Sequence, residues 1–192
     1  MPLQPPTLAF LRYLHTHATV RKQIRAAPGK TMLYAGSRGP TIGSAQFGYL
    51  APMWREIRTL KQRDTQYADK EILHDVLGRV SAPNTPFKSL LLYAQDVERQ
   101  LELLRRTRNA DTDTDGNVLW RALSGIFAAN AEGAVSICIG RDVTRQKVFA
   151  STELPVLLRN AKIDSDTRDI LHYYARCVAA GQTDIGVSII RA

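Results

Sequence analysis

Two apolar stretches of this chain hold aromatic, hydroxyl and carboxylate side chains, the residue types that could carry chemistry. In LWRALSGIF (119–127), Trp120 and Ser124 stand four residues apart, which places both on one face of a helix. In VFASTELPVL (148–157), Glu153 is the only charged residue. A carboxylate in such surroundings is either paired with a distant Arg or Lys or is functional. Glu153 is therefore a candidate catalytic group, with the ion-pair alternative open.

An acidic run, DTDTDG (111–116), comes directly before the first of these stretches and resembles the start of a calcium-binding loop. Asp111, Asp113 and Asp115 alternate and a glycine follows, as in that pattern. The twelfth position, where the loop needs a bidentate glutamate, is Ala122. Acidic residues also favour the first turn of a helix. The run therefore predicts a turn and a helix start rather than a calcium site.

Histidine and cysteine suggest no further site. His74 and His172 have no partners at the spacing of metal ligands, and Cys138 and Cys177 both lie in apolar stretches typical of buried thiols. Neither cysteine belongs to a recognisable nucleophile motif. The sequence predicts no metal site and requires no oxidising compartment.

Composition restricts the class of protein. The chain has 192 residues, 44% of them hydrophobic and 23% charged, which is typical of a globular protein. No apolar run approaches the roughly 20 residues of a membrane helix, and we expect neither a signal peptide nor a membrane partner. The net charge of +8 is spread along the chain. It indicates a solvated basic surface that could attract a phosphorylated small molecule, and no nucleic-acid partner is expected.

The pattern of apolar residues predicts an α/β fold with a helical lobe beside a small, mainly parallel-sheet α/β lobe. We expect one domain, with the helical lobe at about 1–28 and 66–130 and the α/β lobe at about 30–65 and 131–192. The predicted helices span 7–27, 53–62, 69–80, 86–107, 119–131 and 166–180, and the predicted strands span 31–36, 134–140, 147–157 and 185–191.

Several of these stretches together resemble the ADP-ribosyl cyclase / NAD glycohydrolase family. That family has an F-W-x-x-x-S helix, an A-E-G-E-V stretch that leads into a strand, and then F-G-x-x-E-L-P-x-L. This chain has LWRALS (119–124), AEGAV (131–135) and FASTELPVL (149–157), in the same order and at similar spacing over about forty residues. Upstream, LYAG (33–36) corresponds more weakly to the family's F-W-S-G, and ADKEILHDVL (68–77) to its L-E-D-T-L-x-G-Y-x-L.

The resemblance implies roles for six residues. Glu153 would be the catalytic carboxylate that holds the ribose hydroxyls and stabilises the oxocarbenium-like centre left when nicotinamide departs. Trp120 would form the aromatic wall beside the scissile bond, and Tyr34 would stack on nicotinamide where the family has a second tryptophan. Ser124 and Phe149 would contact the phosphates, Phe149 through its backbone. Asp69 would bind the nicotinamide amide and bias cyclisation against hydrolysis, and a slip of the alignment would give that role to Glu71.

By this resemblance, the protein would cleave the nicotinamide–ribose bond of NAD+ in a cleft between the lobes, without a cofactor. Hydrolysis to ADP-ribose is the expected main outcome, with cyclic ADP-ribose as a second product and NADP+ as an alternative substrate. Two cysteines exclude the disulfide framework of the animal members. The trimmed chain suits a cytoplasmic protein or a toxin or effector domain delivered into a target cell, with an immunity or inhibitor protein as partner. The alternatives are a non-catalytic basic module that binds nucleic acid or a protein partner, and a protein ADP-ribosyltransferase.

Overall fold

A computed structural model describes residues 2–35, 41–42, 45–46, 61–63, 65–108, 113–139, 148–181 and 189–190. The helices are α1 (Pro5–Thr16), α2 (Ala18–Gln23), α4 (Leu73–Arg79), α5 (Leu90–Arg108), α6 (Asp113–Ala129), α7 (Leu154–Arg159) and α8 (Ser165–Ala179), with a 3-10 turn η1 (Thr65–Tyr67) and a π-helical turn η2 (Phe149–Glu153). The strands are β1 (Thr31–Ala35), β2 (Thr41–Ile42), β3 (Ala45–Gln46), β4 (Val135–Ile139) and β5 (Ile189–Ile190).

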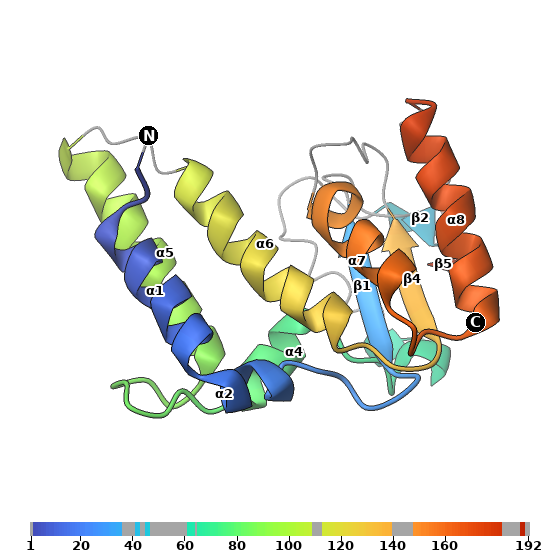
Figure 1. Ribbon diagram of the computed structural model, residues 1–192, viewed down its shortest axis with the longest axis horizontal. Helices are drawn as coiled ribbons and strands as arrows, with labels where there is room; N and C mark the ends of the chain where they lie inside the picture. Colours follow the sequence, from blue (N-terminus) through green and yellow to red (C-terminus); the bar gives the residue numbers. More distant parts are fainter. Residues whose placement is uncertain are drawn as a thin grey trace.

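Helices α1, α5 and α6 lie on one side of the molecule, and the small sheet lies on the other side with α7 and α8 (Figure 1). Helices α1, α5 and α6 pack against one another, while α7 and α8 pack together beside the sheet. Helix α6 contacts both groups, because it also packs against α7 and η2. Buried residues form one continuous hydrophobic cluster that runs from Phe10 in α1 to Tyr174 in α8. This arrangement is of the general α/β class that the sequence predicts.

β4 is the central strand of the three-stranded sheet, whose order is β1-β4-β5, and it pairs in parallel with β1. Thr31 pairs with Val135 and Ala35 with Ile139, whereas β5 runs antiparallel to β4. The predicted strands at 31–36 and 134–140 are confirmed. Parallel pairing requires a long crossover between the strands, and here the chain passes through α4, α5 and α6 before it returns to β4.

Two glycines bring the entrances of β1 and β4 together. Gly29 has φ +71° and Gly133 has φ +72°, a backbone conformation that residues other than glycine rarely adopt. The Gly29 N–H donates to the Glu132 carbonyl at 2.8 Å, and a Cβ at Gly133 would lie 3.3 Å from the Gly29 nitrogen. This close approach fixes which residues of β1 and β4 pair, and in that register Tyr34 lies opposite Cys138.

The acidic run before Trp120 is partly helical. Helix α6 begins at Asp113, earlier than the predicted Leu119, and Asp115 is 2% exposed. Its Oδ1 accepts a hydrogen bond of 2.7 Å from the backbone N–H of Gln4, directly before α1. A carboxylate at a helix N-terminus satisfies an otherwise unpaired donor and is favoured by the helix dipole. Asp115 therefore holds the start of α1 against α6.

Two element predictions are wrong. Residues 147–157 do not form a strand where the structure describes them: η2 leads directly into α7, and Pro155 lies in the first turn, where a missing N–H costs nothing. The helix predicted at 7–27 is divided at His17, whose backbone leaves the helical region with ψ 74°. The helix predicted at 53–62 falls almost entirely outside the described residues. Helices 86–107 and 166–180 are confirmed within a few residues at each end.

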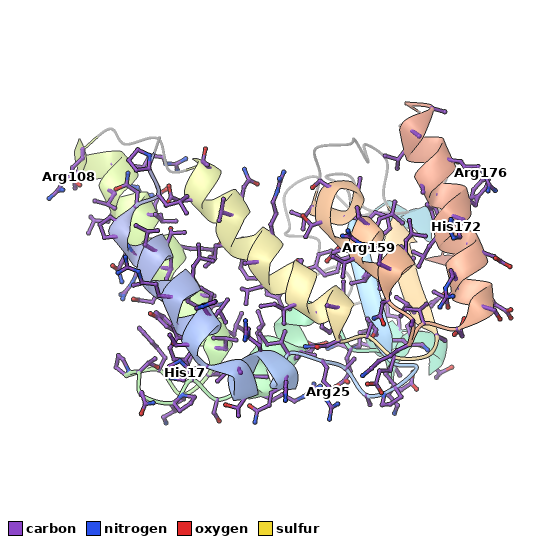
Figure 2. The ribbon with its side chains drawn as sticks, in the orientation of Figure 1. His17, Arg25, Arg108, Arg159, His172 and Arg176 are labelled. Atoms are coloured by element: carbon purple, nitrogen blue, oxygen red, sulfur yellow. The ribbon has the colours of Figure 1, made fainter. Side chains whose placement is uncertain are left out.

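The labelled arginines lie far apart on the surface (Figure 2). Arg108 ends α5, Arg159 ends α7 and Arg176 lies near the end of α8, while Arg25 follows α2. Their separation agrees with a basic charge that is distributed over the molecule.

Candidate functional site

A cavity of about 170 Å³ lies where β1, α4, α6 and η2 meet. Most of its lining is apolar, and the polar groups at its wall come from four different elements. The lining residues are Met32, Leu33 and Tyr34 of β1, Leu73 and His74 of α4, Trp120, Ser124 and Phe127 of α6, Val148, and Glu153 at the end of η2. An apolar pocket with a few convergent polar groups is the usual form of a small-molecule site.

Glu153 is the buried carboxyl group of this cavity. It is 5% exposed, and its side chain shares a hydrogen bond with Ser124, which is itself buried. Burial raises the pKa of Glu153 from 4.5 to about 8, because the charged form loses its hydration, and the hydrogen bond from Ser124 opposes this rise. The group is therefore mainly protonated at neutral pH when the cavity is empty, and a cation in the cavity would favour its ionisation.

Close packing of α6 against η2 brings Ser124 and Glu153 together. Gly125 follows Ser124, and a Cβ there would lie 3.3 Å from Cγ2 of Thr152, the residue before Glu153. The end of α6 is fixed from the same side, because the Asn160 side chain donates to the Ala128 and Ala131 carbonyls at 3.1 and 2.9 Å. Single-turn π-helices such as η2 occur frequently at functional sites.

Three ring-bearing side chains of the lining, Tyr34, His74 and Trp120, contact one another in series. Trp120 and His74 stack with ring centroids 5.0 Å apart and an interplanar angle of 19°. The Tyr34 hydroxyl and His74 Nδ1 are 3.1 Å apart, a hydrogen bond whose donor depends on the histidine tautomer. The Trp120 Nε1–H donates to Glu98 Oε1 at 2.6 Å. Tyr34 and Trp120, both predicted as site residues, are therefore connected through a histidine.

The structure brings together four of the six predicted residues: Tyr34, Trp120, Ser124 and Glu153. Asp69 does not line the cavity; its side chain is 57% exposed and lies 3.8 Å from Lys30 Nζ. The alternative acid, Glu71, also lies elsewhere, where it pairs with Arg79 and accepts from the Ala27 N–H at 2.8 Å. Neither acid is among the residues that line the cavity, and the predicted contact with the nicotinamide amide stays a prediction.

Phe149 is the remaining predicted residue, and it belongs to the core. Its side chain is 1% exposed and meets Tyr174 edge-on at a centroid distance of 6.5 Å. Its side chain therefore anchors the beginning of η2, whose other end carries Glu153. The predicted backbone contact with phosphates stays a prediction.

His74 is a site residue that the sequence pattern does not indicate. It has no partner at metal-ligand spacing in the sequence, and its contacts are with rings distant in the chain. A weak signal is present, since His74 follows two apolar residues, Ile72 and Leu73, within the helix predicted at 69–80. That pattern indicates burial, and His74 is indeed only 9% exposed.

In the described part of the chain, no three His, Cys, Asp or Glu side chains come together as a metal site. Cys177 is a buried free thiol in α8. No helix among the described residues combines the length and the apolar character that crossing a bilayer requires. No family model, curated protein or solved structure matches this chain.

Proposed function

We propose that this protein is an NAD+ glycohydrolase that cleaves the nicotinamide–ribose bond in the cavity around Glu153. One observation carries the proposal: a buried carboxyl group, hydrogen-bonded to Ser124, faces the same small cavity as Trp120. These are the residues in which the sequence resembles the ADP-ribosyl cyclase / NAD glycohydrolase family. ADP-ribose is the main product, with cyclic ADP-ribose as a minor one, and NADP+ is the alternative substrate.

The size of the cavity determines which part of the substrate enters it. Sites that enclose a drug-sized ligand measure roughly 300–1,000 Å³, whereas this one measures about 170 Å³. A single ring fits this space better than a whole dinucleotide. We therefore assign the cavity to the nicotinamide end, and the diphosphate and adenosine lie outside its mouth.

The chemistry requires a carboxylate at the moment of bond cleavage. The C–N bond breaks and its electron pair leaves with nicotinamide, so that positive charge develops on the ribose carbon. A fixed carboxylate in a poorly hydrated site stabilises that charge strongly. The positive nicotinamide ring of the bound substrate would also favour the ionised form of Glu153. Water then adds to the ribose carbon and loses a proton, which gives ADP-ribose.

The test is nicotinamide release from NAD+, followed by chromatography of the nucleotide products. The wild-type protein should release nicotinamide, and Glu153→Gln should lower the rate by about 100-fold or more, as expected for loss of a main electrostatic group. Glu132→Gln is the matched control, since it makes the same change in a carboxylate that is paired with Lys162 outside the cavity. The proposal is wrong if the wild-type protein releases no nicotinamide, or if Glu153→Gln equals the wild type.

The proposal extends to the setting in which the enzyme acts. Consumption of NAD+ by a toxin or effector domain in the cytosol of a target cell is the expected role, and an immunity or inhibitor protein is the expected partner. Expression of the wild-type chain in a test cell should lower the cellular NAD+ content, whereas expression of Glu153→Gln should not. Equal NAD+ content in both cultures would contradict this role.

A further inference from the structure

His74 connects residues from two elements that the cavity separates. Its Nδ1 lies 3.1 Å from the hydroxyl of Tyr34 in β1, and its ring lies against the Trp120 indole in α6. His74 is 9% exposed and stands in the first turn of α4. Tyr34 at its edge and Trp120 at its face therefore both restrain the orientation of the imidazole.

Trp120 packs against the hydrophobic core, and it also borders open space on more than one side. It lines the cavity beside Glu153, and it also lines a separate open groove between α5 and α6 with a volume of about 550 Å³. The indole is only half-buried. Its ring stacks on His74, and its Nε1–H donates a hydrogen bond to Glu98.

We propose that His74 is a positioning residue that holds the Trp120 indole against the cavity, with Tyr34 fixing the orientation of His74. The proposal rests on the proposed function, in which Trp120 forms the wall beside the scissile bond. An offset stack between two rings favours a parallel arrangement of their planes. Without the imidazole, the indole can turn toward the α5–α6 groove and leave the nicotinamide ring without its wall.

The expected effect on catalysis follows from the loss of orientation. Displacement of a positioning group by about 1 Å can cost on the order of 100-fold in rate. We expect His74→Ala to lower kcat/KM by about 10- to 100-fold, with Glu153 unchanged. His74→Phe retains a flat ring for the stack and should keep kcat/KM within about threefold of the wild type. Tyr34→Phe removes the hydroxyl that meets His74 Nδ1 and keeps the stack of His74 on Trp120, so it should likewise keep kcat/KM within about threefold of the wild type.

Rescue by phenylalanine separates positioning from other roles. If His74 only supported the fold, Ala and Phe would differ in thermal stability, and the kcat/KM of the folded Ala variant would equal that of the wild type. If the imidazole took part in proton transfer, Phe would be as inactive as Ala. If His74 blocked the stacking position for the substrate, Ala would lower KM. Each of these three results overturns the proposal.

The fluorescence of Trp120 gives a readout that does not depend on NAD+ cleavage. The chain has two tryptophans, so Trp54→Phe leaves Trp120 as the only indole. In this background, His74→Ala should shift the emission of Trp120 and increase its quenching by acrylamide at least twofold, whereas His74→Phe should resemble the parent. Unchanged emission and quenching in the Ala variant overturn the proposal. An inactive wild-type protein with this fluorescence pattern would refute the NAD+ glycohydrolase and leave the placement of Trp120 by His74 intact.

Discussion

Asp115 and Glu153 are the buried carboxylic acids among the described residues, and their surroundings differ sharply. Asp115 is 2% exposed and accepts a hydrogen bond from the Gln4 backbone at the start of α1. Glu153 is 5% exposed, has the Ser124 hydroxyl as its hydrogen-bond donor, and faces a cavity. Asp115 belongs to α6, and Glu153 lies in η2, which packs against α6. The N-terminal half of α6 thus holds a structural acid and its C-terminal half faces a candidate catalytic one.

The comparison shows that burial alone does not indicate function. A buried charge is stable where fixed dipoles, such as a backbone N–H at a helix N-terminus, replace the water that it has lost. Asp115 has such a donor. Burial raises the pKa of Glu153, the hydrogen bond from Ser124 only partly opposes this rise, and the adjacent cavity lets its charge state respond to what enters.

Replacement of each carboxylate by its amide gives the strongest contrast. Glu153→Gln should lower nicotinamide release by about 100-fold or more, since the amide cannot carry the charge that stabilises the reacting ribose. Asp115→Asn should leave that rate within about twofold of the wild type at temperatures where the protein is folded, because Asp115 does not line the cavity. Steady-state kinetics on both proteins at one pH makes the comparison. Equal losses in the two variants would show that both acids act through the fold.

The pH dependence should show the second difference. The pKa of Glu153 is raised in the folded protein to about 8, so the folded state keeps a proton that the unfolded chain loses above about 4.5. This contribution is fully present below the unfolded value and is lost as the pH rises through about 8, at up to about 1.4 kcal/mol for each pH unit. Over the same range kcat/KM should rise, because the free enzyme gains the carboxylate.

Glu153→Gln is the control for this pH dependence. Urea unfolding between pH 5 and pH 9 should show a smaller fall in the free energy of unfolding for the variant than for the wild type. The variant should therefore gain relative stability at high pH. A parallel fall in both proteins would assign the pH dependence to other groups.

Truncation of the structural acid should cost stability. Asp115→Ala removes the acceptor of the Gln4 N–H and leaves a poorly hydrated donor, which should lower the free energy of unfolding by about 1–3 kcal/mol. Asp115→Asn keeps an acceptor oxygen, and its free energy of unfolding should therefore fall by less than that of the alanine variant. Chemical denaturation of the two variants with the wild type measures this. If alanine and asparagine cost the same, the hydrogen bond to Gln4 contributes little.

A smaller effect is expected where α6 touches η2. Replacement of a helical glycine by alanine raises the free energy of unfolding by about 0.5–1 kcal/mol. The new Cβ of Gly125→Ala, however, would lie 3.3 Å from Thr152 Cγ2. The two effects should nearly cancel in the wild-type background. In a Thr152→Ser background the crowding methyl group is absent, and Gly125→Ala should then stabilise by most of that amount. A double-mutant cycle in urea tests this, and additivity within about 0.3 kcal/mol would contradict it.

The smallest effect is expected for the exposed acid beside the sheet. Asp69→Asn should change neither nicotinamide release nor the ratio of cyclic to linear ADP-ribose by more than about twofold, because Asp69 is exposed beside Lys30. Chromatographic analysis of the products checks both values. A large change in the ratio would show that Asp69 reaches the bound substrate after all, as the resemblance implies.

Periodicity in the sequence predicted the elements that pack through one face. Helices 86–107 and 166–180 carry apolar residues at helical spacing, and the strands near residues 33 and 137 are short apolar runs. The stretch at 147–157 was predicted wrongly, because its valine, phenylalanine and threonine favour a strand when considered alone. Its position against α6, with Pro155 at a helix start, makes it helical instead.

Local sequence patterns are enough to predict those parts of the candidate site that lie close together in the chain. Four-residue spacing placed Trp120 and Ser124 on one face of α6, and an uncharged setting singled out Glu153. Tertiary structure alone decided which groups meet: Ser124 with Glu153, Asp115 with Gln4, and His74 with both Tyr34 and Trp120. The physical reason is that helix periodicity relates residues three or four positions apart, whereas the contacts of His74 join residues 40 or more positions apart. Such contacts exist only once α4, α6 and the parallel β1–β4 pair have packed around the cavity.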